Sequence, residues 1–271
     1  MTRQSGNGSG NRSPRLVVPR EHGAWGMWIV PGVVGAALAQ ENYHLSATFL
    51  VAVFLLYWAR YPVWLWVRSR TRVFPKSIIP STLLIGLVGL AVVIGLAVSY
   101  ERWALTWFGA LAILVMLLHL RLVATGHERS LVGEFLGIAG LGLVGPATYY
   151  VATGSIDTQA ALAWLLPGLF FGSSVFSIKL RVGGYVRVKA GGWPMGMAAA
   201  LLAYQVLVIL VVTLLAAQDL VAPWTIAAYL PVTTQAVWPI WSLRKPPKFR
   251  ILGILWVIHS VLFTVLLIIL V

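Results

Sequence analysis

The sequence predicts an all-α polytopic membrane protein with about nine transmembrane helices. Apolar runs recur from His22 almost to Val271, and each is close to the roughly 20 helical residues that a hydrocarbon core about 30 Å thick requires. Hydrophobic residues make up 59% of the 271 residues and charged residues only 10%, a composition that a soluble domain of this length could not bury. Lys and Arg gather in alternate connections between the runs, as expected of a chain that crosses a membrane repeatedly.

Each predicted span is one apolar run bounded by charged or turn-forming residues. In chain order the spans cover residues 22–40, 47–67, 77–99, 103–122, 131–152, 160–180, 193–217, 221–241 and 250–271. Residues 1–19 are polar and rich in Gly and Ser, so we expect a disordered cytoplasmic tail without the features of a cleaved signal peptide. Residues 20–271 then form a single transmembrane helical domain.

The distribution of basic residues predicts the orientation. All but two of the 20 Lys and Arg precede the first span or follow an even-numbered one; the exceptions are Arg60, inside the second span, and Arg102 on the other side. The positive-inside rule therefore predicts a cytoplasmic N-terminus and an extracytoplasmic C-terminus. The net charge of +13 then belongs to loops that face anionic lipid, and we expect membrane lipids rather than nucleic acid as partners.

Glu21 and His22 form the first candidate for chemistry, because they bring a carboxylate and an imidazole to the cytoplasmic mouth of the first span. A neighbouring Glu and His can share a proton or bind a cation. The structural alternative is an ordinary helix start, in which Glu21 favours the positive end of the helix dipole and Trp25 anchors the helix at the interface.

Arg60 is the second candidate, because a charged group facing lipid at its depth costs roughly 2.5–3.5 kcal/mol. We therefore expect it to face the bundle interior, with Tyr57, Tyr61 and Trp64 as an aromatic wall and Arg68 nearby. Such a wall with a cation in it suits a polyprenyl chain and its phosphate head. The alternative is that Arg60 extends to the headgroups beside an aromatic belt.

His119 and Glu134 form the third group. Glu134 lies about one turn into the fifth span and needs a partner, for which Arg60 and His22 are equal candidates. No spacing of His and Glu matches a recognised ligand motif, and the chain has no cysteine, so we expect neither a metal nor a cofactor.

The sixth span ends in a run of hydroxyls and cations that could hold a phosphate: Ser173, Ser177, Lys179 and Arg181. Hydroxyls that bond to their own helix, with solvated cations, explain the run equally well. In the fifth span Gly140, Gly142 and Gly145 fit a dinucleotide-binding pattern. They follow no strand, so we attribute them to close helix packing.

The segment Pro19–Met27, with the sequence PREHGAWGM, resembles the opening signature of the YwiC-like family of bacterial membrane proteins. This resemblance implies a bacterial inner-membrane location and extends over residues 19–271. Gly26 and Pro31 in the first span, Gly137 through Pro146 in the fifth and the Arg70-Thr71 pair are more distantly similar to the UbiA superfamily of intramembrane prenyltransferases. That similarity implies a UbiA-like bundle.

The catalytic residues of the UbiA superfamily are missing from this chain. Its two aspartate-rich motifs hold magnesium on a diphosphate, whereas the matching positions here are occupied by Tyr57, Trp58, Tyr61, Leu65, Ser173, Leu180, Gly183 and Gly184. We therefore expect no magnesium-dependent ionisation of a diphosphate, although Lys and Arg could neutralise a phosphate directly.

The combined prediction is a cytoplasm-facing cavity that binds a lipid or an isoprenoid, with the phosphate-bearing head at the basic residues. Whether the protein is an enzyme is left open; a divergent transferase would use Glu21, His22 or Glu134 as acid or base. The competing hypotheses are an ion-coupled permease, in which the same residues and Arg60 would relay protons, and an accessory subunit of a membrane complex.

Overall fold

The computed structural model describes residues 22–69, 79–247 and 249–270, without the side chains of 22–24, 65, 68, 69 and 249. The predicted tail 1–19 lies outside this part. Every regular element of the described chain is helical, which confirms the all-α class. The elements are α1 (His22–Ala39), α2 (Tyr43–Ser69), α3 (Ile79–Ser99), α4 (Leu105–Thr125), α5 (Leu131–Gly142), α6 (Val144–Thr153), α7 (Thr158–Lys189), α8 (Met195–Ala217), the 3₁₀ helix η2 (Pro223–Tyr229), α9 (Leu230–Val237), α10 (Pro239–Ser242) and α11 (Phe249–Leu270).

The predicted spans reappear, but nine is an approximate number. Within the described ranges seven helices are long and apolar enough to cross a membrane, counting α5 and α6 together, so the protein is a multi-pass membrane protein. The first span is shorter, with an apolar stretch over Trp25–Ala39. The eighth is divided into η2, α9 and α10, each of which has a proline in its first turn.

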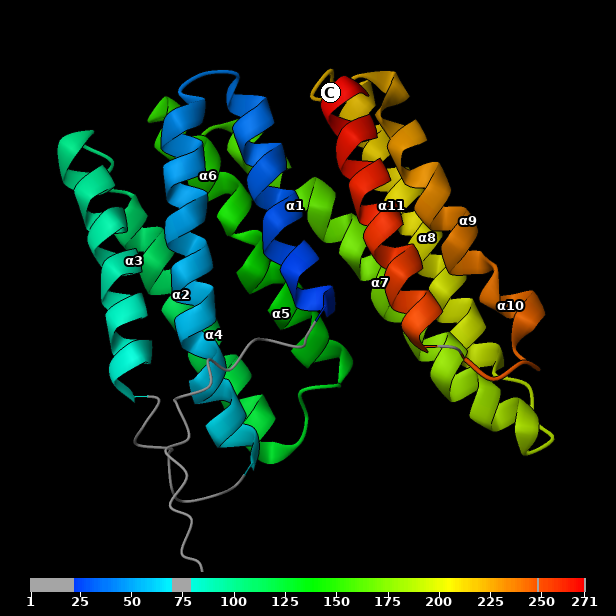
Figure 1. Ribbon diagram of the computed structural model, residues 1–271. Coiled ribbons are helices and arrows are strands. Elements are labelled where there is room, and N and C mark those ends of the chain that lie inside the picture. The colour runs from blue at the N-terminus through cyan, green and yellow to red at the C-terminus, as the bar shows by residue number, and fades with distance from the viewer. Residues whose placement is uncertain (1–21, 70–78, 248, 271) are drawn as a thin grey trace, which may run out of the picture.

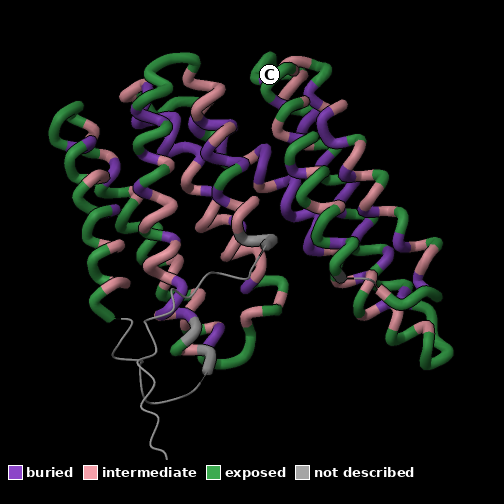
Figure 2. Tube along the Cα trace, viewed as in Figure 1, coloured by how far each residue is buried: buried purple, intermediate pink, exposed green. Residues whose placement is uncertain are grey.

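The helices form two groups, α1–α6 and α7–α11, which meet along α1 and α7 (Figure 1). Helix α1 packs against α6, α7 and α11, whereas α3 packs mainly on α2. Burial follows this arrangement (Figure 2): 67% of the most apolar window of α7 is buried, against 17% in α3 and 6% in α4. Helix α7 is therefore the central element, and α3 and α4 present their side chains to lipid.

Proline explains why the fifth predicted span is two helices. Pro146 has no N–H to offer the carbonyl of Gly142, four residues earlier, so the helical ladder is interrupted there. The chain passes from α5 to α6 at Leu143, whose N–H donates to the Gly140 carbonyl in a tighter turn (3.3 Å).

Glycines let three backbones touch where α1, α6 and α7 cross. A Cβ on Gly35 would lie 2.2 Å from the carbonyl oxygen of Gly145, and a Cβ on Gly145 would lie 2.3 Å from that of Ala163. Gly140 and Gly142 are similarly pressed against side chains of α4 and α7. These contacts confirm close helix packing as the reason for the glycines of the fifth span.

Hydrogen bonds from neighbouring loops close the C-terminal end of α6. The Nε of Arg102 donates to the carbonyl of Val151 (3.1 Å), while Nη2 of Arg102 (3.4 Å) and Nδ2 of Asn42 (2.9 Å) donate to that of Ala152. Gly154 follows with φ +80°, and a Cβ there would also collide with the Arg102 guanidinium. Arg102 therefore caps a helix C-terminus, where a cation is favoured.

Asp157 begins α7 at the same end of the molecule. Its carboxylate accepts hydrogen bonds from the hydroxyls of Tyr149 (2.9 Å) and Ser155 (3.0 Å) and from the N–H groups of Gln159 and Ala160. Partial loss of water would by itself raise the pKa of this carboxyl, but the four donors outweigh it and hold the pKa below its usual value. Asp157 thus ties α6 to α7 in its ionised form.

We expect Gly145→Ala to lower the free energy of unfolding by about 1–3 kcal/mol, because the added methyl group must push two backbones apart. Gly253→Ala is the matched control: it also lies inside a helix, but a Cβ there meets nothing within 4 Å. Thermal unfolding of both variants in detergent measures the difference. Equal melting temperatures would contradict the proposed backbone contact.

Asp157 should make stability depend on pH. Because its pKa is lowered in the folded state, its contribution is present above the ordinary value of 3.8 and is lost as the pH falls through the lower, folded value. Asp157→Ala should cost about 0.5–2 kcal/mol at neutral pH through loss of the cap. Asp157→Asn keeps a capping oxygen but cannot titrate, so the melting temperature of this variant should fall less steeply at acid pH. If the fall at acid pH is the same as in the wild type, other groups cause the pH dependence.

Candidate functional site

Arg60 lies in the C-terminal half of α2 and is partly buried. The Cζ of its guanidinium stands 5.0 Å from the centre of the Tyr57 ring, a cation–π contact. Its Nε is buried and has no hydrogen-bond acceptor among the described residues. The Arg60 side chain thus carries a positive charge and an unused hydrogen-bond donor within the long apolar helix α2.

His119 of α4 lies within electrostatic range of Arg60 and of Glu128. The imidazole makes a hydrogen bond with the backbone of Gly133, and its Cε1 would be 3.9 Å from a Cβ on Gly137. The His119 ring therefore packs against the side of α5 that carries Gly133 and Gly137. Its Nδ1 is buried and unpartnered within the described chain, so Arg60 and His119 contribute two unpaired nitrogens to one region.

Apolar packing holds α2 against α4 at this level. Tyr61 and Trp64 stack with their ring centres 5.8 Å apart and are both almost fully buried. They form a cluster with Val123 of α4, and Leu120 packs against it. These contacts fix the spacing of the helices that carry Arg60 and His119.

An aromatic group on α1 and α2 surrounds the other face of Tyr57. The centre of its ring lies 5.2 Å from that of Trp25 and 6.1 Å from that of Trp28, and Phe54 joins Trp25 to Trp58. Trp28 is buried, and its Nε1 has no acceptor in the described ranges. Trp25 and Trp28 are therefore packed in this group.

Glu134 has a different partner from the two that the sequence offered. Its Oε2 lies 3.2 Å from Nζ of Lys179, so the ion pair joins α5 to α7 instead of linking Glu134 to Arg60. Nζ of Lys179 also donates to the carbonyl of Arg129 (2.6 Å), just before α5. The ion pair therefore links the two groups of helices. The side chains of Glu134 and Lys179, both expected to act on a ligand, are already paired with each other.

The other predicted residues do not gather around Arg60. Ser173 is buried and donates to the carbonyl of Leu169 in its own helix (3.3 Å), as the structural alternative had it; Ser177 is also buried. Nη2 of Arg181 donates to Oγ of Ser242 in α10 (3.0 Å). The residues predicted to hold the head group are thus divided between α2, which carries Arg60, and α7, whose Lys179 and Arg181 contact α5 and α10. Glu21 and the side chains of His22 and Arg68 lie outside the described part.

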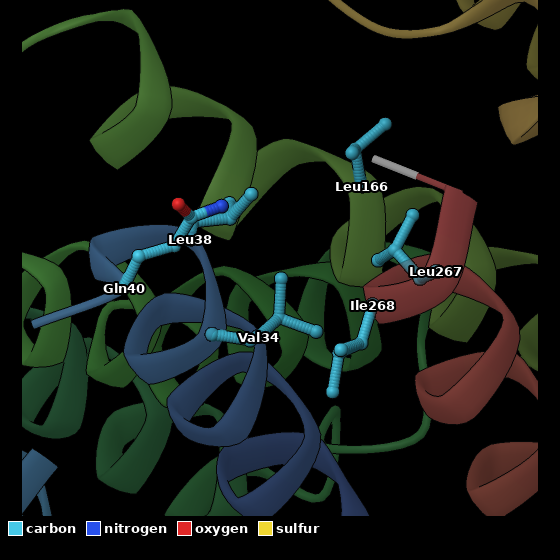
Figure 3. A pocket seen from close by; sticks show the side chains of 7 residues that line it. Val34, Leu38, Gln40, Leu166, Leu267 and Ile268 are labelled. Carbon is cyan, nitrogen blue, oxygen red and sulfur yellow. The ribbon is translucent and has the colours of Figure 1, made fainter.

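A small, open recess lies between α1, α7 and α11 (Figure 3). It is far from Arg60: it is at the Gln40 end of α1, where α2 begins, and Arg60 is about 25 Å further along α2 at 1.5 Å per residue. Apolar side chains dominate its lining, which consists of Val34, Ala37, Leu38, Gln40, Leu166, Leu267 and Ile268. This recess is therefore not the predicted cytoplasm-facing cavity.

Comparison with known proteins supports one of the two resemblances. The model of the YwiC-like protein family matches residues 18–149. The chain is also 26% identical over 166 residues to the uncharacterized protein YwiC of Bacillus subtilis (strain 168), an alignment that covers 61% of the chain and 66% of that protein. The chain thus spans slightly less than two thirds of its relative.

The YwiC-like resemblance is confirmed over this region. No solved structure matches the chain, so the similarity to the UbiA superfamily rests on the sequence motifs alone.

We expect Lys179→Met to lower the free energy of unfolding by about 1–3 kcal/mol, because it leaves the half-buried Glu134 carboxylate and the Arg129 carbonyl without their donor. The double variant that exchanges the two charges, Glu134→Lys with Lys179→Glu, should recover part of the lost stability. The ion pair can form again, but the hydrogen bond to the Arg129 carbonyl cannot. Lys189→Met, which removes an exposed cation of the same helix, is the control. Melting temperatures of these three variants and of the single exchanges Glu134→Lys and Lys179→Glu test this. If the losses of the two single exchanges simply add in the exchanged pair, the two side chains are not in direct contact.

Proposed function

We propose that this YwiC-like membrane protein binds the anionic head of a lipid or isoprenoid at Arg60 and His119. The observation that carries the proposal is the pair of buried nitrogens, Arg60 Nε and His119 Nδ1, which lack partners among the described residues although they belong to neighbouring helices. A phosphate oxygen accepts a hydrogen bond from the Arg60 Nε–H. The neutral His119 ring uses its N–H for the Gly133 backbone, so its Nδ1 would accept a hydrogen bond from the P–OH of a phosphate monoanion.

The balance of energies favours an anion at this place. Holding an arginine charge within the bilayer core costs roughly 2.5–3.5 kcal/mol, whereas its contact with the Tyr57 ring returns about 0.5–2 kcal/mol. Glu134, the acid that the sequence offered as a partner for Arg60, is paired with Lys179. A bound phosphate would supply the missing acceptor and neutralise the charge, and a guanidinium can hold it in a bidentate manner.

The apolar part of such a ligand would follow the aromatic side chains of α1 and α2. Trp25, Phe54, Tyr57 and Trp58 form a continuous chain of ring contacts from the Arg60 guanidinium toward α1. Aromatic walls of this kind suit prenyl or acyl chains. The asymmetry of Lys and Arg orients the site toward the cytoplasm of a bacterial cell.

We propose that the head is bound without magnesium. Within the described residues no three His, Asp or Glu side chains come together in a way that could hold a metal ion. Two or more carboxylates would be needed to hold a divalent cation against a diphosphate. Direct contacts from Arg60 and His119 explain phosphate binding with the residues that are present.

Titration of farnesyl phosphate onto the purified protein in nanodiscs, followed by native mass spectrometry, tests the proposal. Arg60→Leu should weaken binding at least tenfold, as expected when a charge-assisted contact worth about 1.5–3 kcal/mol is lost. Arg121→Leu removes an exposed charge from the helix that carries His119 and should change little. Arg102 is unsuitable as a control, because it caps α6.

Added salt should weaken this binding, and EDTA should leave it unchanged. Equal affinity of the wild type and Arg60→Leu would refute the site, and binding that requires magnesium would refute the metal-free mode. Wild-type protein that retains no phosphate-bearing lipid but carries protons across liposomes would favour the permease.

A further inference from the structure

Four segments of the C-terminal group of helices meet around a small apolar cluster, at the end of the molecule where α7 terminates (Figure 1). A Cβ on Gly184 of α7 would lie 3.0 Å from Cδ2 of Leu243, just after α10, and 3.2 Å from Cγ of Pro194, just before α8. These contacts hold the last turns of α7 beside α10 and the start of α8. The buried members of the cluster are Leu180, Ala198, Leu201, Ala236 and Leu243.

Arg181 follows the buried Leu180 directly and is itself partly buried. Its Nη2 donates a hydrogen bond to Oγ of Ser242, the last residue of α10 (3.0 Å). The described ranges give Arg181 no acidic partner. Its guanidinium is therefore held between α7 and α10 with a charge that no carboxylate balances.

Further cations share this end of the molecule. The exposed ones are Arg187 and Lys189, in the last turn of α7, and Arg244 and Lys245, directly after α10. From residue 180 to the end of the chain, Asp219 is the one acidic residue. It follows the far end of α8, which at 1.5 Å per residue puts it roughly 35 Å away along the 23 residues of that helix. Arg181, Arg244 and Lys245 thus form a basic surface without nearby acids.

The length of α7 places the basic surface at the level of the lipid head groups. Helix α7 has 32 residues, whereas the hydrocarbon core needs about 20. Counted from Thr158, about 20 residues reach Ile178, so Arg181 falls just beyond the hydrocarbon. Trp238 and Trp241 precede Arg244 in the chain and are 64% and 76% exposed. Exposed tryptophans of this kind are enriched where a membrane meets water.

We propose that the basic surface binds the phosphate of an anionic phospholipid, whose acyl chains lie along the exposed rings of Trp238 and Trp241. A guanidinium can hold a phosphate with two parallel hydrogen bonds, and clustered Lys and Arg beside membrane helices attract anionic lipid. The tryptophans and the depth of Arg181 favour a lipid over a phosphate free in solution. The surface belongs to the C-terminal group of helices and does not depend on the function proposed for Arg60 and His119.

Titration of the purified protein in detergent with phosphatidylglycerol tests the proposal, with phosphatidylcholine of the same acyl chains as the uncharged reference. Native mass spectrometry counts the bound lipids. All variants are made in an Arg60→Leu background, so that a lipid at Arg60 and His119 does not contribute. Phosphatidylglycerol should bind at least tenfold more tightly than phosphatidylcholine. Equal affinities would overturn the proposal.

The double variant Arg244→Gln with Lys245→Gln should weaken phosphatidylglycerol binding at least tenfold, because two cations are lost from the surface. The matched control, Arg121→Gln with Arg129→Gln, removes two exposed cations from the N-terminal group and should change the affinity less than twofold. Equal losses in the two double variants would reduce the effect to overall charge and overturn the site.

Arg181→Leu should weaken binding to a similar extent. If this variant does not fold, the double variant decides alone, since Arg244 and Lys245 are exposed. Glycerol 1-phosphate, the head group without acyl chains, should compete only at concentrations at least a hundredfold above those of the lipid. Competition at equal concentration would show that the surface recognises free phosphate, and the assignment to a lipid would fall.

Discussion

Backbone contact at Gly35, Gly145 and Ala163 fixes how the two groups of helices meet. Because no side chain intervenes at Gly35 and Gly145, α1 and α6 approach more closely than branched residues would permit. Helix α7 then packs against both, and the large apolar cluster forms around it from α1, α8, η2, α9 and α11. The positions of Arg60 in one group and Arg181 in the other both depend on this crossing.

Two arginines show how the structure separates support from function. Arg102 places its donors on the last carbonyls of α6, so its charge stabilises a helix end. Arg60 rests against Tyr57 and keeps a buried Nε without an acceptor within the described chain. Extension of Arg60 to the headgroups would bring this nitrogen to water, and its burial therefore favours the interior orientation. The same type of side chain has its Nε bonded in one place and unpaired among the described residues in the other.

The sequence was sufficient to predict the helical class and the location of most spans, because lipid imposes long apolar runs and internal backbone hydrogen bonds. It also indicated why the fifth span contains so many glycines. It did not show where the eighth span is broken, since proline within a transmembrane segment can either kink or divide a helix. A polar Gln205 in an otherwise apolar run indicated a buried hydrogen bond, but composition alone could not identify Thr233 as its partner.

The sequence could not choose between partners that are chemically equivalent. Glu134 could neutralise any cation within reach, and only the crossing of α5 and α7 brings Lys179 to it rather than Arg60. Once this pair forms, the acid that would have balanced Arg60 is no longer available, and Ser173 has already bonded to its own helix. What remains is a cation and an imidazole on adjacent helices in the N-terminal group. Because the unpaired groups of the N-terminal group include a cation, the ligand that we propose for Arg60 and His119 is an anion.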